Sequence, residues 1–135
     1  MKKKLSIIFL LLIPVICTNA QEATRWRGSQ GNGIYAETGL LKSWPQNGPE
    51  ILWTYDGLGE GFSSPAFAND MIYLSGTIDG IGHVYALSQS GKLIWKKPYG
   101  PEFTESYPGS RTTPVIAGDL LYIYSGMGLL TCMSA

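Results

Sequence analysis

The 135-residue sequence has little of what disulfide-stapled or zinc-bound domains require. It contains two cysteines and one histidine. Cys17 lies in the apolar N-terminal stretch, so Cys132 is alone in the rest of the chain and a disulfide framework is excluded. His83 and Cys132 together cannot supply the four ligands of a usual zinc site. We therefore expect a buried apolar cysteine and a histidine on a loop or strand.

The chain also has no large excess of positive or negative charge. The chain has ten basic and ten acidic residues, and three of the basic ones are Lys2, Lys3 and Lys4. Beyond them seven basic residues stand against ten acidic ones, a net charge of −3. A mildly acidic chain without a basic run argues against a nucleic-acid partner.

Catalytic signatures are missing as well. The chain has no G-x-S-x-G nucleophile motif. Five acids lie scattered in loop-like sequence, with no spacing typical of a calcium loop or an acid/base pair: Asp56, Glu60, Asp79, Glu102 and Glu105. The glycine-rich run 57–61 lacks the helix that a dinucleotide-binding loop needs, so we interpret it as a flexible loop between structural units.

The N-terminus has the pattern of a signal peptide. Its lysines precede an apolar stretch from Leu5 to Ile16, which is short for a membrane span. Thr18 and Ala20 supply small residues at positions −3 and −1, so we expect cleavage after Ala20 and a periplasmic or secreted chain without a transmembrane span. An uncleaved anchor stays open, as does a lipid anchor on Cys17, although a large residue precedes that cysteine.

An internal repeat follows. Residues 64–76 match residues 113–126, with the pairs Pro65/Pro114, Asp70/Asp119 and Tyr73/Tyr122 all 49 positions apart. The match continues more weakly from 82–88 to 128–134, and Ile51-Leu52-Trp53 resembles Leu93-Ile94-Trp95. A repeat of this length is typical of stacked architectures.

Each repeat is predicted to be β-structure. Short runs of β-branched and aromatic residues are separated by turn residues, which predicts strands near 64–68, 71–76, 83–88 and 92–97. Four short strands per repeat of about 45–50 residues are what a propeller blade requires. We therefore expect an all-β chain, a partial β-propeller of about two four-stranded antiparallel blades.

The residues Ala86-Leu87-Ser88-Gln89-Ser90-Gly91-Lys92-Leu93-Ile94-Trp95 resemble the repeat of pyrroloquinoline-quinone-like (PQQ-like) β-propellers, A-x-D-x-x-T-G-K-x-x-W, with Ser88 and Ser90 in place of Asp and Thr. The segments 26–28, 44–53 and 107–114 are also similar to a PQQ-like subfamily of exported bacterial proteins. Gly91 falls in a tight turn where positive φ is expected, and Ser90 is placed to bond the turn backbone. The resemblance implies that Trp53 and Trp95 dock neighbouring blades.

The chain divides into a leader (1–20), a loop-rich segment (21–50) and propeller repeats (51–135). Because the loop-rich segment carries two tryptophans, we expect it to pack on the repeats. The repeats stop where the family would continue to T-G-K-x-x-W, so we expect a truncated chain that lacks the blades needed to close a propeller. Such a chain would expose a sheet face and edge strands, and we expect it to self-associate.

Candidate binding residues precede the first strand of each repeat, where they would line the axial channel. They are Ser63, Ser64, Arg111, Thr112 and Thr113. Arg111 is suited to hold a carboxylate, or else it is tied to a nearby carbonyl or acid such as Glu105. We assign no catalytic residue and no metal ligand.

Two functions fit these observations. The first is a non-catalytic binding or scaffold protein of the envelope, which needs no cofactor and whose edges and loops take a protein or peptide partner. The second is the N-terminal part of a PQQ-dependent alcohol or sugar dehydrogenase, a class whose cofactor is PQQ with calcium. The lack of a catalytic cluster favours the first, while fold resemblance alone decides nothing.

Overall fold

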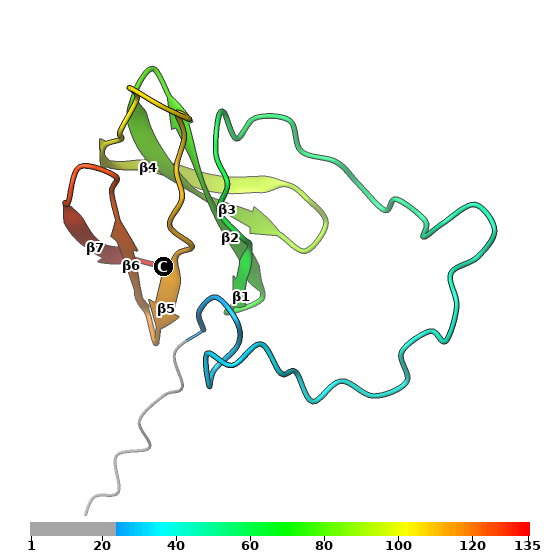
Figure 1. Cartoon of the computed structure of the whole chain (residues 1–135). Helices are drawn as coiled ribbons and strands as arrows, with labels where there is room; N and C mark the ends of the chain where they lie inside the picture. Colours follow the sequence, from blue (N-terminus) through cyan, green and yellow to red (C-terminus); the bar gives the residue numbers. More distant parts are fainter. Residues whose placement is uncertain (1–23) are drawn as a thin grey trace, which may run out of the picture.

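The computed structural model describes residues 24–135 and shows an all-β arrangement of two antiparallel sheets that lie side by side (Figure 1). The first sheet has the order β1-β2-β3-β4, with β1 at Ala66–Ala68, β2 at Met71–Ile78, β3 at Ile81–Ser88 and β4 at Leu93–Pro101. The second has the order β5-β6-β7, with β5 at Val115–Ala117, β6 at Leu120–Tyr124 and β7 at Leu130–Ser134.

These sheets confirm the predicted all-β class and fit an incomplete propeller. The four strands of the first sheet fall where the sequence placed them, although β4 runs on to Pro101. Among residues 24–135 there is no helix long and apolar enough to cross a membrane. The predicted leader lies outside the described residues.

Turn chemistry explains the hairpins of the first sheet. Asn69 and Asp70 join β1 to β2, and both have positive φ, 51° and 58°. Asp79 and Gly80 join β2 to β3 with φ of 51° and 76°. Two consecutive residues of positive φ match the right-handed twist of antiparallel strands, and Asn, Asp and Gly adopt this conformation at least cost.

The core lies between the two sheets. We call the face of each sheet that carries Tyr73, or its repeat equivalent Tyr122, the A face, and the opposite one the B face. The A face of the first sheet packs against the B face of the second. The cluster contains Ala66, Tyr73, Val84, Ala86 and Tyr99 from the first sheet, with Ile116, Leu121 and Ile123 from the second. Burying this apolar surface is what holds the sheets together.

Two hydrogen bonds across this interface join residues that are one repeat apart. The Ser64 backbone N–H donates to Thr113 Oγ1 at 3.1 Å, and both residues precede the proline of their repeat. Asn69 Nδ2 donates to the carbonyl oxygen of Gly118 at 3.2 Å. Each pair is separated by 49 positions, which equals the sequence repeat. The sheets are therefore consecutive copies of one unit, with β1 beside β5.

The loop-rich N-terminal segment differs from the prediction. Its start is attached to the second sheet, because Thr24 and Ile116 exchange backbone hydrogen bonds of 2.8 and 3.0 Å. Residues 33–52 then leave the sheets in a wide arc and return before β1 (Figure 1). The expectation that this segment packs on the repeats is wrong for the arc, where Leu41 and Trp44 are about 70% exposed. Gly, Pro and Asn are dense in the arc, and it contains no strand that could join a sheet.

The position of Cys132 also differs from the prediction. It lies on β7 and is exposed, although the sequence predicted a buried cysteine. In the ladder it pairs with Tyr122, which places both on the A face of the second sheet. No element of the described chain covers that face.

We predict that Leu121→Ala lowers the free energy of unfolding by about 2–5 kcal/mol, because it leaves a cavity between the sheets. Leu40→Ala is the matched control, since it truncates an exposed leucine of the arc and is expected to change stability by less than about 0.5 kcal/mol. Urea unfolding followed by circular dichroism measures both. Equal effects of the two substitutions would contradict an inter-sheet core.

Candidate functional site

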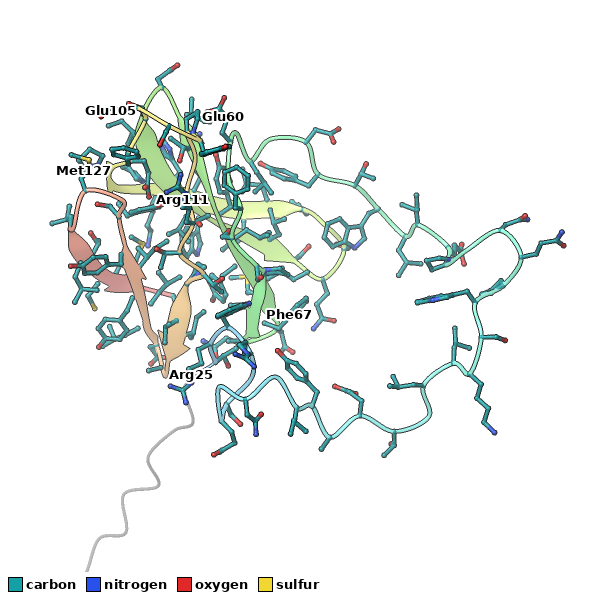
Figure 2. All side chains as sticks on the ribbon, in the orientation of Figure 1. Arg25, Glu60, Phe67, Glu105, Arg111 and Met127 are labelled. Atoms are coloured by element: carbon teal, nitrogen blue, oxygen red, sulfur yellow. The ribbon has the colours of Figure 1, made fainter. Side chains whose placement is uncertain are left out.

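A groove lies beside the segments that precede β1 and β5, where the N-terminal segment approaches them. Its volume is about 510 Å³. The lining residues are Arg25, Trp26, Phe62, Ser64, Arg111, Thr112, Thr113 and Val115. Figure 2 shows Arg111 above the upper end of β5 and Arg25 near its lower end, so one arginine lies toward each end of the groove.

Backbone contacts between the two repeats fix the wall of this groove. Phe62 donates its backbone N–H to the carbonyl oxygen of Ser110 at 2.7 Å. Ser75 of β2 reaches across with its hydroxyl, 3.0 Å from Ser110 Oγ and 2.8 Å from the Thr112 carbonyl oxygen. Ser75 and Ser110 are buried, so these bonds form away from water, where they are strongest. The residues from 110 to 113 are thereby held against the first sheet.

Both arginines of the groove are positioned by carbonyl oxygens. Arg111 Nη2 donates to the carbonyl oxygens of Ser106 and Tyr107 at 3.1 and 2.7 Å. Arg25 Nε and Nη2 donate to the carbonyl oxygen of Ser29 at 3.2 and 2.8 Å. Within residues 24–135 neither guanidinium forms an ion pair. Each retains positive charge and further N–H donors, as needed to hold a carboxylate.

Four of the five candidate binding residues meet in this groove: Ser64, Arg111, Thr112 and Thr113 line it, whereas Ser63 does not. The Ser63 hydroxyl instead donates to the Ser75 carbonyl oxygen at 3.1 Å and accepts its N–H at 3.3 Å. The sequence left two interpretations of Arg111, a carboxylate-binding residue or one bonded to nearby groups. In the structure Arg111 is hydrogen-bonded to loop carbonyl oxygens and forms no ion pair with Glu105.

Three groove residues, Arg25, Trp26 and Phe62, were not predicted. Trp26 and Phe62 expose more than 60% of their surface. Arg25 and Trp26 reach the groove because Thr24 pairs with Ile116, and Phe62 is held there by its backbone hydrogen bond to Ser110. Both contacts join distant parts of the chain. The adjacent Arg25 and Trp26 are the one signal in the sequence that points to two of them.

Trp53 lies against the turn between β3 and β4. Its indole Nε1 donates to the Gln89 carbonyl oxygen at 2.9 Å. A Cβ on Gly91 would come within 2.6 Å of the Trp53 ring, and Gly91 has a φ of 79°. Glycine is required at position 91 for two reasons: the backbone has positive φ, and the indole approaches too closely for a side chain. Ser88 Oγ accepts the Lys92 N–H at 3.2 Å and lies 2.9 Å from Ser90 Oγ, so Ser88 bonds the turn backbone where Ser90 had been expected to.

Trp95 lies on β4 and packs at the edge of the inter-sheet core. Its ring centroid is 6.0 Å from that of Tyr73, and Lys97 Nζ is 4.5 Å from the ring centre. The core residues beside it come from both sheets. Trp95 therefore contributes area to the interface between consecutive repeats.

Glu102 is a buried carboxylate that the sequence placed in a loop. It accepts hydrogen bonds from the Tyr99 hydroxyl and from the Gly126 backbone N–H, the latter at 2.7 Å. Gly126 follows β6, so the carboxylate links the two sheets. Each of its oxygens has a structural donor, which gives Glu102 a structural role in this arrangement.

Comparison with protein-family models and with curated proteins found no match to this chain. Among residues 24–135 no three His, Cys, Asp or Glu side chains lie close enough to hold a metal ion.

We predict that Gly91→Ala destabilises the protein more than Gly128→Ala. Both glycines have positive φ, 79° and 87°, but no atom lies within 4 Å of a Cβ at Gly128. Gly128→Ala is the control and should lower the free energy of unfolding by about 1–2 kcal/mol, because alanine disfavours positive φ. Gly91→Ala should lower it by about 1–3 kcal/mol more, because the added Cβ displaces the Trp53 ring. Urea unfolding gives the difference, and faster hydrogen exchange of the Trp53 indole N–H identifies its cause. Equal costs would show that Trp53 does not dock on this turn.

A pH dependence follows from Tyr99. Burial, followed by the hydrogen bond to Glu102 and its charge, raises the pKa of Tyr99 above the ordinary 10.0. The folded state holds this proton more tightly than the unfolded state. The resulting stability is complete below about pH 10 and is lost as the pH rises toward the folded-state pKa.

Tyr99→Phe should therefore lower the unfolding free energy by about 1.5–3 kcal/mol at neutral pH, the usual worth of a hydrogen bond to a charged group. It should also flatten the loss of stability above pH 10, as measured by urea unfolding at a series of pH values. Tyr124→Phe, at a half-exposed tyrosine, serves as the control. An unchanged alkaline slope in Tyr99→Phe would contradict this assignment.

Proposed function

We propose that the chain is a non-catalytic binding or scaffold protein of the bacterial envelope, built on PQQ-like β-propeller repeats. Its ligand in this proposal is an extended peptide segment that carries carboxylates and an aromatic side chain. The signal-peptide pattern and the repeat motif support the location and the family. The groove beside the segments that precede β1 and β5 supports the binding role.

One observation carries the proposal. The groove has two arginines whose hydrogen bonds within the described residues go to carbonyl oxygens, and it has two exposed aromatic rings, Trp26 and Phe62. Planar guanidinium groups recognise carboxylates with paired donors. Exposed aromatic rings beside them provide the apolar anchors that dominate binding energy at interfaces. The hydroxyls of Thr112 and Thr113 add donors that suit a peptide backbone.

The test uses two arrays of short peptides rich in aromatic residues. One array contains Asp and Glu, and the other has Asn and Gln at the same positions. The labelled full chain should bind the acidic array at least about tenfold more tightly, a difference of 1.4 kcal/mol. Arg111→Gln should reduce that preference, whereas Lys42→Gln, which removes an equal charge in the arc, should not. Equal binding to both arrays, or equal effects of the two substitutions, would refute the groove as the site.

A PQQ-dependent dehydrogenase is the alternative that the family resemblance leaves open. Adding PQQ and Ca²⁺ to the protein and recording dye-linked oxidation of alcohols separates the two functions. The binding proposal predicts no turnover above that of the cofactor alone. Turnover that saturates with protein-bound PQQ would establish the oxidoreductase instead.

A further inference from the structure

Each sheet has one apolar face that no second sheet of the described chain covers. On the first sheet Ile72, Tyr85 and Leu87 of this face are buried, whereas Phe67 is 61% exposed. The B face of the first sheet borders a cavity of about 600 Å³ lined by Phe67, Ile72, Leu74 and Leu87. Residues 53–58 cover part of this face: Tyr55 packs against Tyr85, and Trp53 and Leu58 also line the cavity. The A face of the second sheet presents Tyr122, Tyr124 and Leu130. Uncovered apolar surfaces of this kind mark interaction sites.

The two uncovered faces are the two halves of the interface that already exists within the chain. Phe67, Ile72 and Leu74 precede Ile116, Leu121 and Ile123 by 49 positions, and the latter three are buried against the first sheet. Ala66 and Tyr73 lie on the A face of the first sheet and cover the B face of the second sheet. Their repeat equivalents are Val115 and Tyr122, on the A face of the second sheet. The A face of the second sheet therefore has the side-chain pattern that covers a B face.

Within residues 24–135 the second sheet has no fourth strand. In the first sheet β4 pairs with β3, whereas β7 pairs with β6 and with no other described strand, which leaves its outer edge open. Residues 51–55 have the sequence of such a strand, because Ile51-Leu52-Trp53 resembles Leu93-Ile94-Trp95 of β4. They belong to no strand of the described chain, and Leu52 is 81% exposed. Trp53 fixes them beside the B face of the first sheet.

We propose that copies of this chain assemble head to tail. The A face of the second sheet of one copy packs on the B face of the first sheet of the next. Residues 51–55 of that next copy pair with the free edge of β7 and complete a four-stranded unit. The occupant of the uncovered face is thus a second copy, because the contact continues the repeat contact already present between the two sheets. This inference does not depend on the proposed peptide groove.

The assembly is expected to be closed. A head-to-tail contact uses two different surfaces, so it generates a ring when the rotation per copy closes and a filament when it does not. Propellers close with about four to eight blades. The described residues of each copy contribute two units, so on the order of two to four such chains complete the ring.

The first test measures the mass of the full chain in solution by light scattering after size-exclusion chromatography. The expected result is a discrete species of two to four times the mass of one chain. Phe67→Asp should convert it to monomer, because it places a charge on the exposed β1 edge of the B face. Phe62→Asp is the matched control, since Phe62 is similarly exposed, 65% against 61%, but lies in the groove. It should leave the assembly intact.

A mixing experiment tests the direction of the contact. Phe67→Asp retains an intact A face, and Tyr122→Asp retains an intact B face. Each variant alone should be monomeric, and an equal mixture should form a heterodimer and nothing larger. A contact between two identical faces predicts that only one of the variants dissociates and that mixing restores nothing, which would overturn the proposal.

Strand donation has its own test. Leu52→Pro removes an N–H from the donated strand and should weaken assembly at least about tenfold, whereas Leu41→Pro, at another exposed leucine of the N-terminal segment, should not. A monomeric wild-type chain would overturn the proposal. Polydisperse aggregates that persist in Phe67→Asp would also overturn it. Failure of these tests leaves peptide binding in the groove unaffected, so the two proposals fail separately.

Discussion

The contact between the A face of one sheet and the B face of the next is the constraint on which the other features depend. A twisted sheet of three or four short strands has two faces and cannot bury both by itself. Here Tyr73 and Ala86 of the first sheet are covered by Leu121 and Ile123 of the second, and all four are almost inaccessible to water. The same stacking requirement leaves each outer face without a further sheet within the described chain.

The groove is a consequence of that contact. Stacking brings β1 beside β5, and the residues just before each strand then form one wall. Ser75 ties that wall to the first sheet through Ser110 and Thr112. The arginines are oriented by loop carbonyls, which leaves their charge available to a ligand. The geometry of the groove therefore depends on the register between repeats more than on any single loop.

Much of the fold could be predicted because its signals are local. Turn residues such as Asn69-Asp70 and Asp79-Gly80 determine hairpins through their own backbone preferences. The 49-residue repeat predicted that the two units would be alike, and it identified Ser64 and Thr113 as equivalent positions that the structure joins by a hydrogen bond. These inferences required no knowledge of distant contacts.

The remainder depends on contacts between distant parts of the chain. Thr24 pairs with Ile116, and no pattern in either segment predicts it. That pairing brings Arg25 and Trp26 to the groove. Two tryptophans suggested that the N-terminal segment is packed, but the arc finds no sheet to join, so Trp44 is exposed. Glu102 resembled a loop acid because its partners, Tyr99 and Gly126, come together only when the sheets stack.

The stacking of the two sheets can be tested directly by nuclear Overhauser effects in isotope-labelled protein. We predict cross-peaks between the side chains of Tyr73 or Ala86 and the methyl groups of Leu121 and Ile123. These residues form the contact within one chain, whereas contacts between copies would join Tyr122 to Ile72 and Leu74. Absence of the first set, or cross-peaks from Leu121 to Ile72 in their place, would contradict the A-face to B-face packing of consecutive repeats.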